Sequence, residues 1–443
     1  MSFDLPLLPN GWQYISLEEL SQETSITYGV VQPGTAVSEG VPIIRVNNFK
    51  NGRLELSDVM HIAPDIESKY ARTRLAGGEV LLTIVGSVGQ VAVVPKSLNG
   101  FNVARAVAVI HPLDVVSANW IAICLRSPLA QHLLGSRANT TVQTTINLKD
   151  LRALPVPVPP VAIRQAIEDL IYSLDDRIAL LRETNASLEA MAQALFKSWF
   201  VDFDPVHANA GTRAASLPAE LQALFPSTFT DTPQGLVPEG WRVVPFTETI
   251  NVIGGGTPKT SIAEYWGGDI PWFSVVDAPA ATDVFVIDTE KRITESGLNH
   301  SSTKLLPAGT TIISARGTVG RLALVGREMA MNQSCYGLRG KYGDDYFTYF
   351  TTCRLVEALK QRSHGSVFDT ITRDTLAGVS VISPDSAVVA AFESVVGAVM
   401  GKIKNNLQQA QTLATLRDTL LPRLISGQLR LPEVEAALVE AGA

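Results

Sequence analysis

The sequence has little cysteine and no grouping of cysteine with histidine. Its 443 residues include only three cysteines, Cys124, Cys335 and Cys353, and their spacing matches no metal-binding motif. The six histidines are also spread singly along the chain. Disulfide-rich domains and zinc modules require several such residues at short spacing. The sequence therefore predicts neither a disulfide framework nor a metal site.

Long apolar runs are missing as well, although 46% of the residues are hydrophobic. No uninterrupted run approaches the roughly 18 residues that span a bilayer. The N-terminus lacks the charged start and apolar core of a signal peptide. We expect a cytoplasmic protein without a membrane partner. A chain of this length and apolar content is expected to form about two to four domains with buried cores.

Catalytic motifs are the third absence. There is no G-x-x-x-x-G-K-[ST] loop for nucleoside triphosphates. There is also no Asn-Pro-Pro or Asp-Pro-Pro followed by an aromatic residue, the loop expected of an amino-methyltransferase. The glycine pairs at positions 86/89 and 317/320 are better explained as tight turns. Asp202 and Asp204 are better explained by helix capping than by acid–base chemistry. We interpret the chain as non-catalytic and without a cofactor of its own.

The net charge of −7 is distributed unevenly. Residues 151–236 carry 6 basic and 10 acidic side chains, whereas residues 1–150 carry 11 and 12 and residues 237–383 carry 14 and 15. Two local basic clusters in the first segment comprise Arg45, Lys50 and Arg53, and Lys69, Arg72 and Arg74. Such clusters can contact phosphates without a basic total, although solvated surface is an equally good explanation for each.

The sequence does contain an internal repeat, which is clearest in two apolar tracts related by a constant offset of 225 residues. The first tract is Ile167, Ile171, Leu174, Ile178, Leu181, Asn185, Leu188, Ala192, Leu195 and Trp199. The second is Phe392, Val396, Val399, Ile403, Asn406, Ala410, Leu413, Arg417, Leu420 and Leu424. Both alternate steps of four and three, the pattern of a helix that packs along one face.

The segments before the two tracts also resemble each other. The Gly-Trp pair at position 11 recurs at position 240, and residues 78–89 recur at 309–320. Three residues at 142, 145 and 146 match those at 367, 370 and 371. The offsets between these matches differ slightly, because loops absorb small insertions at little cost. The chain is therefore interpreted as a duplicated domain followed each time by a helix.

The two helices are expected to pair with each other, because an exposed apolar face would leave large side chains unburied at about 1.5–3 kcal/mol each. In a parallel pairing, Asn185 and Asn406 would each face an apolar residue. In an antiparallel pairing with matched ends, the two asparagines share one layer and can satisfy each other. We therefore predict an antiparallel coiled coil. Pairing between two chains remains an alternative at this stage.

Local patterns predict several further elements. Strands are expected at 42–46, 79–85 and 103–110, and a helix at 119–126 after Ser117. The proline-rich segment 154–160 excludes helix and central strand, so it predicts an extended connector. It leads into a helix that starts near Val161 and ends near Phe200. Asp385 is a plausible N-cap residue of the second helix.

Several strings resemble the specificity subunits of type I restriction–modification systems. They are the Gly-Trp opening at 240, residues 254–260 (GGGTPKT), 264–272 (EYWGGDIPW), 314–320 (SARGTVG), 188–205 (LEAMAQALFKSWFVDFDP) and 420–429 (LLPRLISGQL). The motifs occur in the expected order over nearly the whole chain. The resemblance implies an α+β fold with two target-recognition domains separated by a two-helix antiparallel coiled coil, related by an internal pseudo-twofold duplication.

The resemblance also implies a non-catalytic function. Each target-recognition domain would bind one half of a split site in double-stranded DNA, and the helices would set the gap. Two modification (methyltransferase) subunits and restriction (translocase/nuclease) subunits would be the protein partners. S-adenosylmethionine, ATP and magnesium would belong to those partners. The alternative from the residues alone is a coiled-coil scaffold with two binding modules, whereas a standalone methyltransferase would need the missing loop.

The expected domain boundaries follow from these patterns. We expect a first recognition domain at 1–158 (the first module), a central helix at 159–205, a linker at 206–236, a second recognition domain at 237–383 (the second module), a distal helix at 384–430 and a tail at 431–443. The tract from Ile167 to Trp199 covers 33 residues. At about 1.5 Å per residue it is roughly 50 Å long, or on the order of 14 base pairs of DNA.

Candidate DNA-binding residues are polar side chains on expected loops, since base edges are recognised by hydrogen bonds and apolar contacts in the grooves. In the first module they are Arg45, Asn47, Asn48, Lys50, Ser87, Arg105, Gln143 and Thr144. In the second module they are Lys259, Thr260, Ser274, Asp277, Arg316, Thr318, Arg321 and Ser366. A role in turns or caps is an equally good explanation for any single member.

Overall fold

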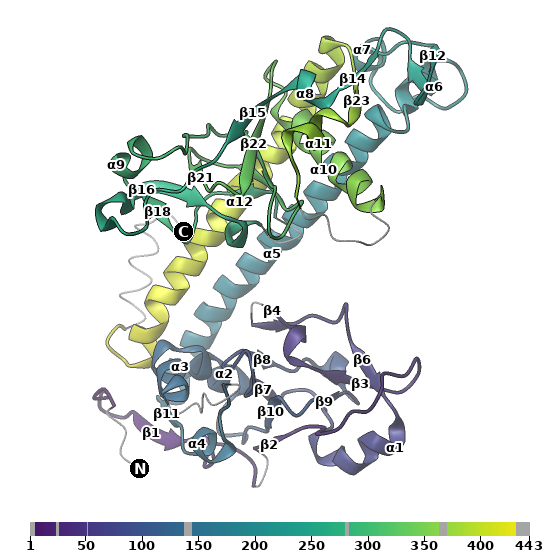
Figure 1. Ribbon diagram of the computed structural model, residues 1–443. Helices are drawn as coiled ribbons and strands as arrows, with labels where there is room; N and C mark the ends of the chain where they lie inside the picture. Colours follow the sequence, from purple (N-terminus) through teal and green to yellow (C-terminus); the bar gives the residue numbers. More distant parts are fainter. Residues whose placement is uncertain are drawn as a thin grey trace. The chain divides into compact units, whose positions relative to one another are not determined.

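The computed structural model describes residues 5–23, 26–50, 52–136, 144–279, 283–362 and 370–430 (Figure 1). The chain divides into two compact units. Unit 1 contains residues 1–176 and 413–443, and unit 2 contains residues 177–412. Each unit therefore combines one module with parts of both long helices. The two units are described in turn.

Unit 1 is built on two small sheets, and short helices connect some of their strands. Its strands are β1 Gln13–Ser16, β2 Thr27–Tyr28, β3 Val41–Ile44, β4 Phe49–Lys50, β5 Arg53–Leu54, β6 Met60–Ile62, β7 Val80–Thr83, β8 Val91–Val93, β9 Asn102–Val103, β10 Val107–Ile110 and β11 Pro155–Val158. The main sheet has the order β2-β10-β7-β8 and the second sheet the order β6-β3-β9. Two further pairs are β1-β11 and the hairpin β4-β5.

Short helices cover the sheets of unit 1. They are α1 Pro64–Glu67, α2 Ala118–Arg126, α3 Pro128–Gly135 and α4 Leu148–Arg152, with 3₁₀ turns η1 Val46–Asn48, η2 Ser68–Thr73 and η3 Lys96–Leu98. Helix α2 begins as predicted, because the Ser117 side chain accepts a hydrogen bond from the Trp120 amide. The buried Trp120 indole donates to the Pro157 carbonyl at 2.8 Å, which fixes α2 against β11.

Unit 2 contains the second module and the segment before it. Its strands are β12 Phe229–Thr232, β13 Gly235–Pro238, β14 Arg242–Pro245, β15 Ile250–Gly254, β16 Trp266–Phe273, β17 Phe285–Val286, β18 Arg292–Ile293, β19 Thr311–Ser314, β20 Leu322–Val325, β21 Ala330–Met331, β22 Cys335–Gly340 and β23 Ser380–Ser383. Its short helices and turns are α6 Asp204–Asn209, α7 Ala219–Gln222, α8 Phe246–Thr249, α9 Glu295–Asn299, α10 Asp345–Arg362, α11 Arg373–Ala377, η4 Ala263–Tyr265 and η5 Val275–Asp277.

The two modules share the same arrangement of their main strands. The sheet β15-β22-β19-β20 in unit 2 has the same chain order as β2-β10-β7-β8 in unit 1, with β17 added at one edge. In the second sheets, β3 pairs antiparallel with β6 and parallel with β9, while β16 pairs antiparallel with β18 and parallel with β21. The edge pair β1-β11 corresponds to β14-β23. The duplication predicted from the sequence is thus present in the topology.

One local expectation was wrong. The segment 103–110 is not one strand, because β9 and β10 belong to different sheets and Ala104 to Ala106 connect them. The proline segment is extended and is neither helix nor central strand, as expected. It also pairs with β1 as the edge strand β11, where missing proline donors are tolerated.

The segment 206–236, expected as a linker, is folded onto unit 2. Val206 and Phe225 are buried, and the Phe225 ring meets Trp199 edge-to-face at 5.1 Å. The Asn209 amide donates to the Phe225 carbonyl at 2.8 Å. Apolar residues within a polar segment therefore anchor it to the helix end.

The long helices are α5 Val161–Phe200 and α12 Ser386–Ile425. Both begin where the sequence predicts, and Asp385 accepts a hydrogen bond from the Ala387 amide at 2.8 Å. In unit 1 the start of α5 packs with the end of α12, since Ile167 and Leu424 share one core. In unit 2 the pairing is also antiparallel, with Trp199 against Phe392 at 5.9 Å. The pairing lies within one chain.

The helix pair in unit 2 contains the two seam asparagines. Asn406 Nδ2 donates to Asn185 Oδ1 at 2.9 Å, and Asn185 Nδ2 donates to the Ile403 carbonyl at 3.1 Å. Both side chains are 2% exposed. This is the layer that the antiparallel alignment of the two tracts predicts.

Helix α12 is long and apolar enough to cross a membrane when judged by length and composition alone. Its apolar face is occupied, because Phe392, Val396 and Ile403 are buried in the core of unit 2. A packed core helix can be equally long and apolar, so length and composition are weak evidence for a membrane span here.

Candidate nucleic-acid interface

The first module presents a turn, η1, directly after strand β3. The Arg45 amide donates to Asn48 Oδ1 at 2.9 Å, and Asn48 Nδ2 donates to the carbonyls of Glu55 and Asp58 at 3.0 Å each. Asn48 is only 2% exposed. Its amide therefore builds the turn and holds the following loop, which is the turn role that the sequence left open beside base contact.

The other candidates on this turn lie at the surface. The Arg45 guanidinium and the Asn47 amide both donate to Asp58 Oδ2, at 3.1 and 2.9 Å. Asn47 is exposed, whereas Arg45 is half-buried. The structure thus brings Arg45 and Asn47 together on one carboxylate, which a phosphate or base would have to replace.

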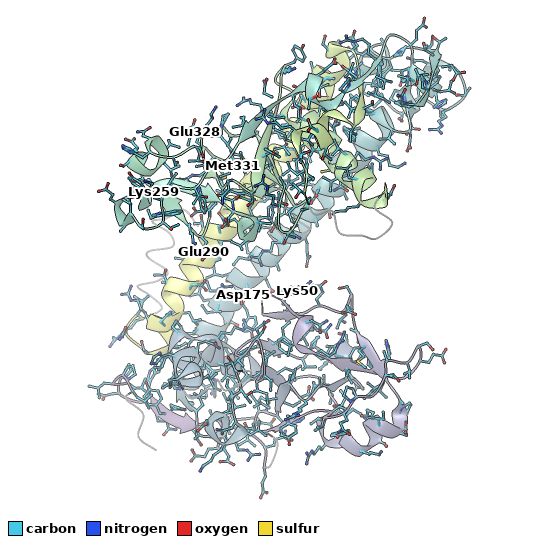
Figure 2. The ribbon with its side chains drawn as sticks, viewed as in Figure 1. Lys50, Asp175, Lys259, Glu290, Glu328 and Met331 are labelled. Carbon is cyan, nitrogen blue, oxygen red and sulfur yellow. The ribbon has the colours of Figure 1, made fainter. Side chains whose placement is uncertain are left out.

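The hairpin β4-β5 follows the turn and carries the exposed Lys50, which pairs with Glu55. The same bond holds the pKa of the Glu55 carboxyl below its ordinary value. The hairpin also meets helix α5, because Arg53 pairs with Asp176 at 2.8 Å. Figure 2 labels Lys50 of the hairpin and Asp175, the residue before Asp176 on α5. The basic cluster of Arg45, Lys50 and Arg53 is therefore matched by carboxylates.

The second module repeats the turn as η5, after strand β16. The Ser274 amide donates to Asp277 Oδ2 at 2.8 Å, and the Glu290 amide donates to Asp277 Oδ1 at 2.7 Å. Asp277 thus plays the part of Asn48, and Ser274 that of Arg45. The position of Asn47 is taken by Val276, which is 72% exposed and which the polar-residue criterion missed.

The two glycine motifs are tight turns, as predicted. In the first module, Thr83 Oγ1 donates to the Ser87 carbonyl at 2.6 Å. In the second, Ser314 Oγ donates to the Thr318 carbonyl at 2.5 Å. The glycines at 86, 89, 317 and 320 all have φ between 76° and 92°, which other residues rarely adopt. Ser87 and Thr318 are exposed at equivalent places on these turns.

A second segment runs beside each glycine turn. Val85 bridges Thr145, and the Gly86 amide donates to the carbonyl of the exposed Thr144 at 3.1 Å. In the second module, Arg316 bridges Thr370 in the same manner. Ser87 therefore lies near Thr144, and Arg316 lies near Thr318. The candidates Gln143 and Ser366 belong to these segments but lie outside the described residues.

The remaining candidates are separate exposed side chains. Arg105 follows β9, and its backbone amide donates to the Val30 carbonyl at 2.8 Å. Lys259 and Thr260 lie in the loop before η4. The Arg321 guanidinium donates to the Pro279 carbonyl at 3.1 Å. Arg321 thus connects the glycine turn of the second module with the loop that follows η5.

Cys124 and Cys335 are buried and Cys353 is half-buried, and none of the three has a reactive thiol. Burial raises the pKa of the Cys124 thiol well above its ordinary value, and raises the pKa of Cys335 and Cys353 to about 12. Their thiols are therefore protonated at neutral pH and unsuited to nucleophilic chemistry. In the described ranges, no group of three or more His, Cys, Asp or Glu side chains could hold a metal ion.

Comparison with known families gives a direct match. The model of the type I restriction modification DNA specificity domain matches residues 9–190 and 238–407, so it covers both modules. The chain belongs to this family. The two matches also include most of α5 and part of α12, so the family unit consists of a recognition module and its helix.

Relatives of this specificity family agree with the assignment. The chain is 26% identical to the type I restriction enzyme HindI specificity subunit of Haemophilus influenzae, covering 94% of this chain and 99% of the relative. It is 31% identical to the EcoBI specificity subunit of Escherichia coli over 42% of each chain. A crystal structure of a type I restriction–modification S subunit from M. genitalium has the same fold, with a TM-score of 0.54, 16% identity and coverage of 96% and 99%.

Both relatives are named as specificity subunits of type I restriction enzymes. The chain is accordingly a non-catalytic specificity subunit of a type I system.

Proposed function

We propose that this specificity subunit binds a bipartite DNA site, with one module on each half-site. The main support for this proposal is that the two modules contain the same hydrogen-bonded turn but expose different side chains on it. Asn48 and Asp277 hold equivalent turns, while Asn47 and Val276 occupy the exposed position. One scaffold with two sets of exposed residues suits the recognition of two different half-sites.

We further propose that the long helices bind the modification subunits. Both helices expose apolar side chains that do not belong to the two seam tracts, and such residues are available for a partner protein. These residues are Val161, Ile163, Leu180, Met191 and Val395, each at least 38% exposed. Restriction subunits would join this core, and S-adenosylmethionine, ATP and magnesium would bind to the partners.

A binding experiment tests the DNA function. The sequence context of methylated adenines in the host genome defines the candidate site and its gap. The full-length chain, co-expressed with its modification subunit, should bind a duplex with that site at least about a hundredfold more tightly than a scrambled duplex at the same salt concentration. Changing either half-site alone should remove most of this preference.

Two results would argue for the scaffold alternative instead. One is equal affinity for all duplexes, and the other is a complex in which the modification subunit binds DNA specifically without this chain. A matched comparison uses Asn47→Ala and Leu236→Ala, both exposed positions. Only the first, which lies on the turn η1, should alter the preference for one half-site.

A further inference from the structure

The turn η5 of the second module exposes an apolar side chain where the first module exposes an amide. Val276 is 72% exposed, one of the most exposed large apolar residues among those described in unit 2. Its counterpart Asn47 is also exposed but polar. The difference lies at the one position of the turn that the framework leaves free.

Hydrogen bonds define the framework around Val276. Asp277 accepts hydrogen bonds from the Ser274 amide at 2.8 Å, the Ser274 hydroxyl at 2.9 Å and the Glu290 amide at 2.7 Å. These donors hold the turn against the following loop and engage both carboxylate oxygens of Asp277. The carboxylate therefore has a structural task in the turn, while the neighbouring Val276 side chain stays at the surface.

The fold gains little from a valine here. The side chain buries little surface, and a β-branched residue is a poor choice for a helical turn. A single exposed apolar residue is ordinary on a protein surface. This one, however, stands on a turn that both modules preserve, and a cation lies next to the same loop, because Arg321 donates to the Pro279 carbonyl at 3.1 Å.

We propose that Val276 contacts the C5-methyl group of a thymine in the second half-site, with Arg321 on a neighbouring phosphate. The proposal rests on the proposed function. A valine cannot donate or accept a hydrogen bond, and the thymine methyl is the apolar group that base pairs present in the major groove. Val276 is thus a specificity-determining residue, and Asn47 makes the polar contact at the equivalent place in the first half-site.

Substituting thymine by uracil tests the contact, because the change removes the methyl group and leaves the base pairing intact. Each thymine of the second half-site is replaced singly, and affinity is measured for the full-length chain in complex with its modification subunit. At one position the wild-type complex should lose affinity about three- to fivefold, the effect of one buried methyl group. The other positions should show smaller losses.

Variants then assign that loss to the valine. Val276→Ala should lower the affinity for the thymine duplex and become insensitive to uracil at that position, whereas Val276→Ile should retain the sensitivity. Leu236→Ala, which removes a 61% exposed apolar side chain from β13, is the matched control and should behave as the wild type. Circular dichroism checks that the turn variants fold.

The outcomes separate this inference from the proposed function. If the wild-type complex prefers its site but no uracil substitution weakens binding, the thymine contact is wrong while DNA recognition stands. The same holds if Val276→Ala keeps the full sensitivity to uracil. A wild-type complex that shows no preference for any sequence would overturn both proposals together.

Discussion

Individual polar residues inside the helix pair decide how the two helices align. The hydrogen bond between Asn185 and Asn406 is buried in unit 2, where neither amide can reach water. A buried amide without its partner is costly, whereas a matched pair costs little and excludes other alignments. We therefore propose that this pair specifies the register of the helices.

Replacing the two asparagines should separate their effect on stability from their effect on the register of the helices. Asn406→Leu alone leaves Asn185 Oδ1 buried without its donor, which should lower the free energy of unfolding by about 1–3 kcal/mol. The double variant Asn185→Leu, Asn406→Leu removes both amides and should be at least as stable as the wild type. Urea unfolding measures both effects. Cross-linking of cysteine pairs placed one heptad out of register should rise only in the double variant; equal yields in the wild type would argue against the register role.

A second residue-scale prediction concerns pH. Glu393 of α12 accepts hydrogen bonds from the amides of Tyr346 and Phe347, at 3.3 and 2.7 Å, at the start of α10. Burial is the largest influence on this carboxyl and raises its pKa from 4.5 to about 7. The folded state therefore binds the proton more tightly, and the free energy of unfolding should fall as pH rises from about 4.5 to about 7.

Glu393→Gln should remove this dependence, because the Gln side chain stays neutral and can still accept one amide. Relative to the wild type, the variant should gain about 1–2 kcal/mol between pH 4 and pH 8, a value reduced for partial solvent access. Denaturant unfolding at a series of pH values measures the difference. Glu357→Gln, on an exposed face of α10, is the control. An identical gain in the control would show that Glu393 is not responsible.

At the scale of elements, a partly buried carboxylate joins α2 to the helix ends of unit 1. Asp175 of α5, whose side chain is 16% exposed, pairs with Arg417 of α12 at 2.5 Å and with Arg126 of α2 at 3.3 Å. One side chain thus connects three elements of unit 1. Arg417 is the one charged residue of the second tract, and this partner explains how it is accommodated.

Asp175→Asn should leave the partly buried Arg126 guanidinium without its charged partner. Arg417 would then pair only with Asp418, whose side chain is 63% exposed. The expected cost is about 2 kcal/mol, measured by hydrogen exchange of peptides from α2 and the end of α12. Asp176→Asn is a close control, because its pair with Arg53 is exposed on both sides, at 74% and 53%. It should change stability by less than about 0.5 kcal/mol. Equal protection in the two variants would contradict a special role for Asp175.

Comparison of particular elements shows what the sequence could and could not predict. The helix starts at Ser117, Val161 and Asp385 were predictable because caps and prolines act within a few residues. The break after β9 was not, because it depends on which sheet each strand joins. For Asn48 the sequence left a turn role and base contact as equally good explanations, because its partners Glu55 and Asp58 lie in the following loop.

At the scale of the whole molecule, the helices are expected to determine the gap between half-sites. Both α5 and α12 are continuous helices of 40 residues. Each unit contains one module and one end of the helix pair. When each module binds one half-site, as proposed, the length of the two helices should set the distance between the half-sites. The helix length therefore becomes a measurable determinant of specificity.

Inserting one heptad into each helix, after Asp176 in α5 and before Leu413 in α12, tests this directly. Seven residues add about 10 Å of helix, or roughly three base pairs of DNA. The preferred gap should therefore increase by about three base pairs while both half-site sequences stay unchanged. A heptad preserves the packing face of the helices, but three base pairs rotate one half-site by about 100° around the DNA axis. Affinity for the longer gap should thus be weaker than wild-type affinity for the native gap.

Inserting three heptads into each helix adds about nine base pairs, close to one full turn, and should recover part of the affinity. Selection from a duplex library with variable gaps measures both preferences, and an unchanged preferred gap in either variant would show that the helices do not set the spacing.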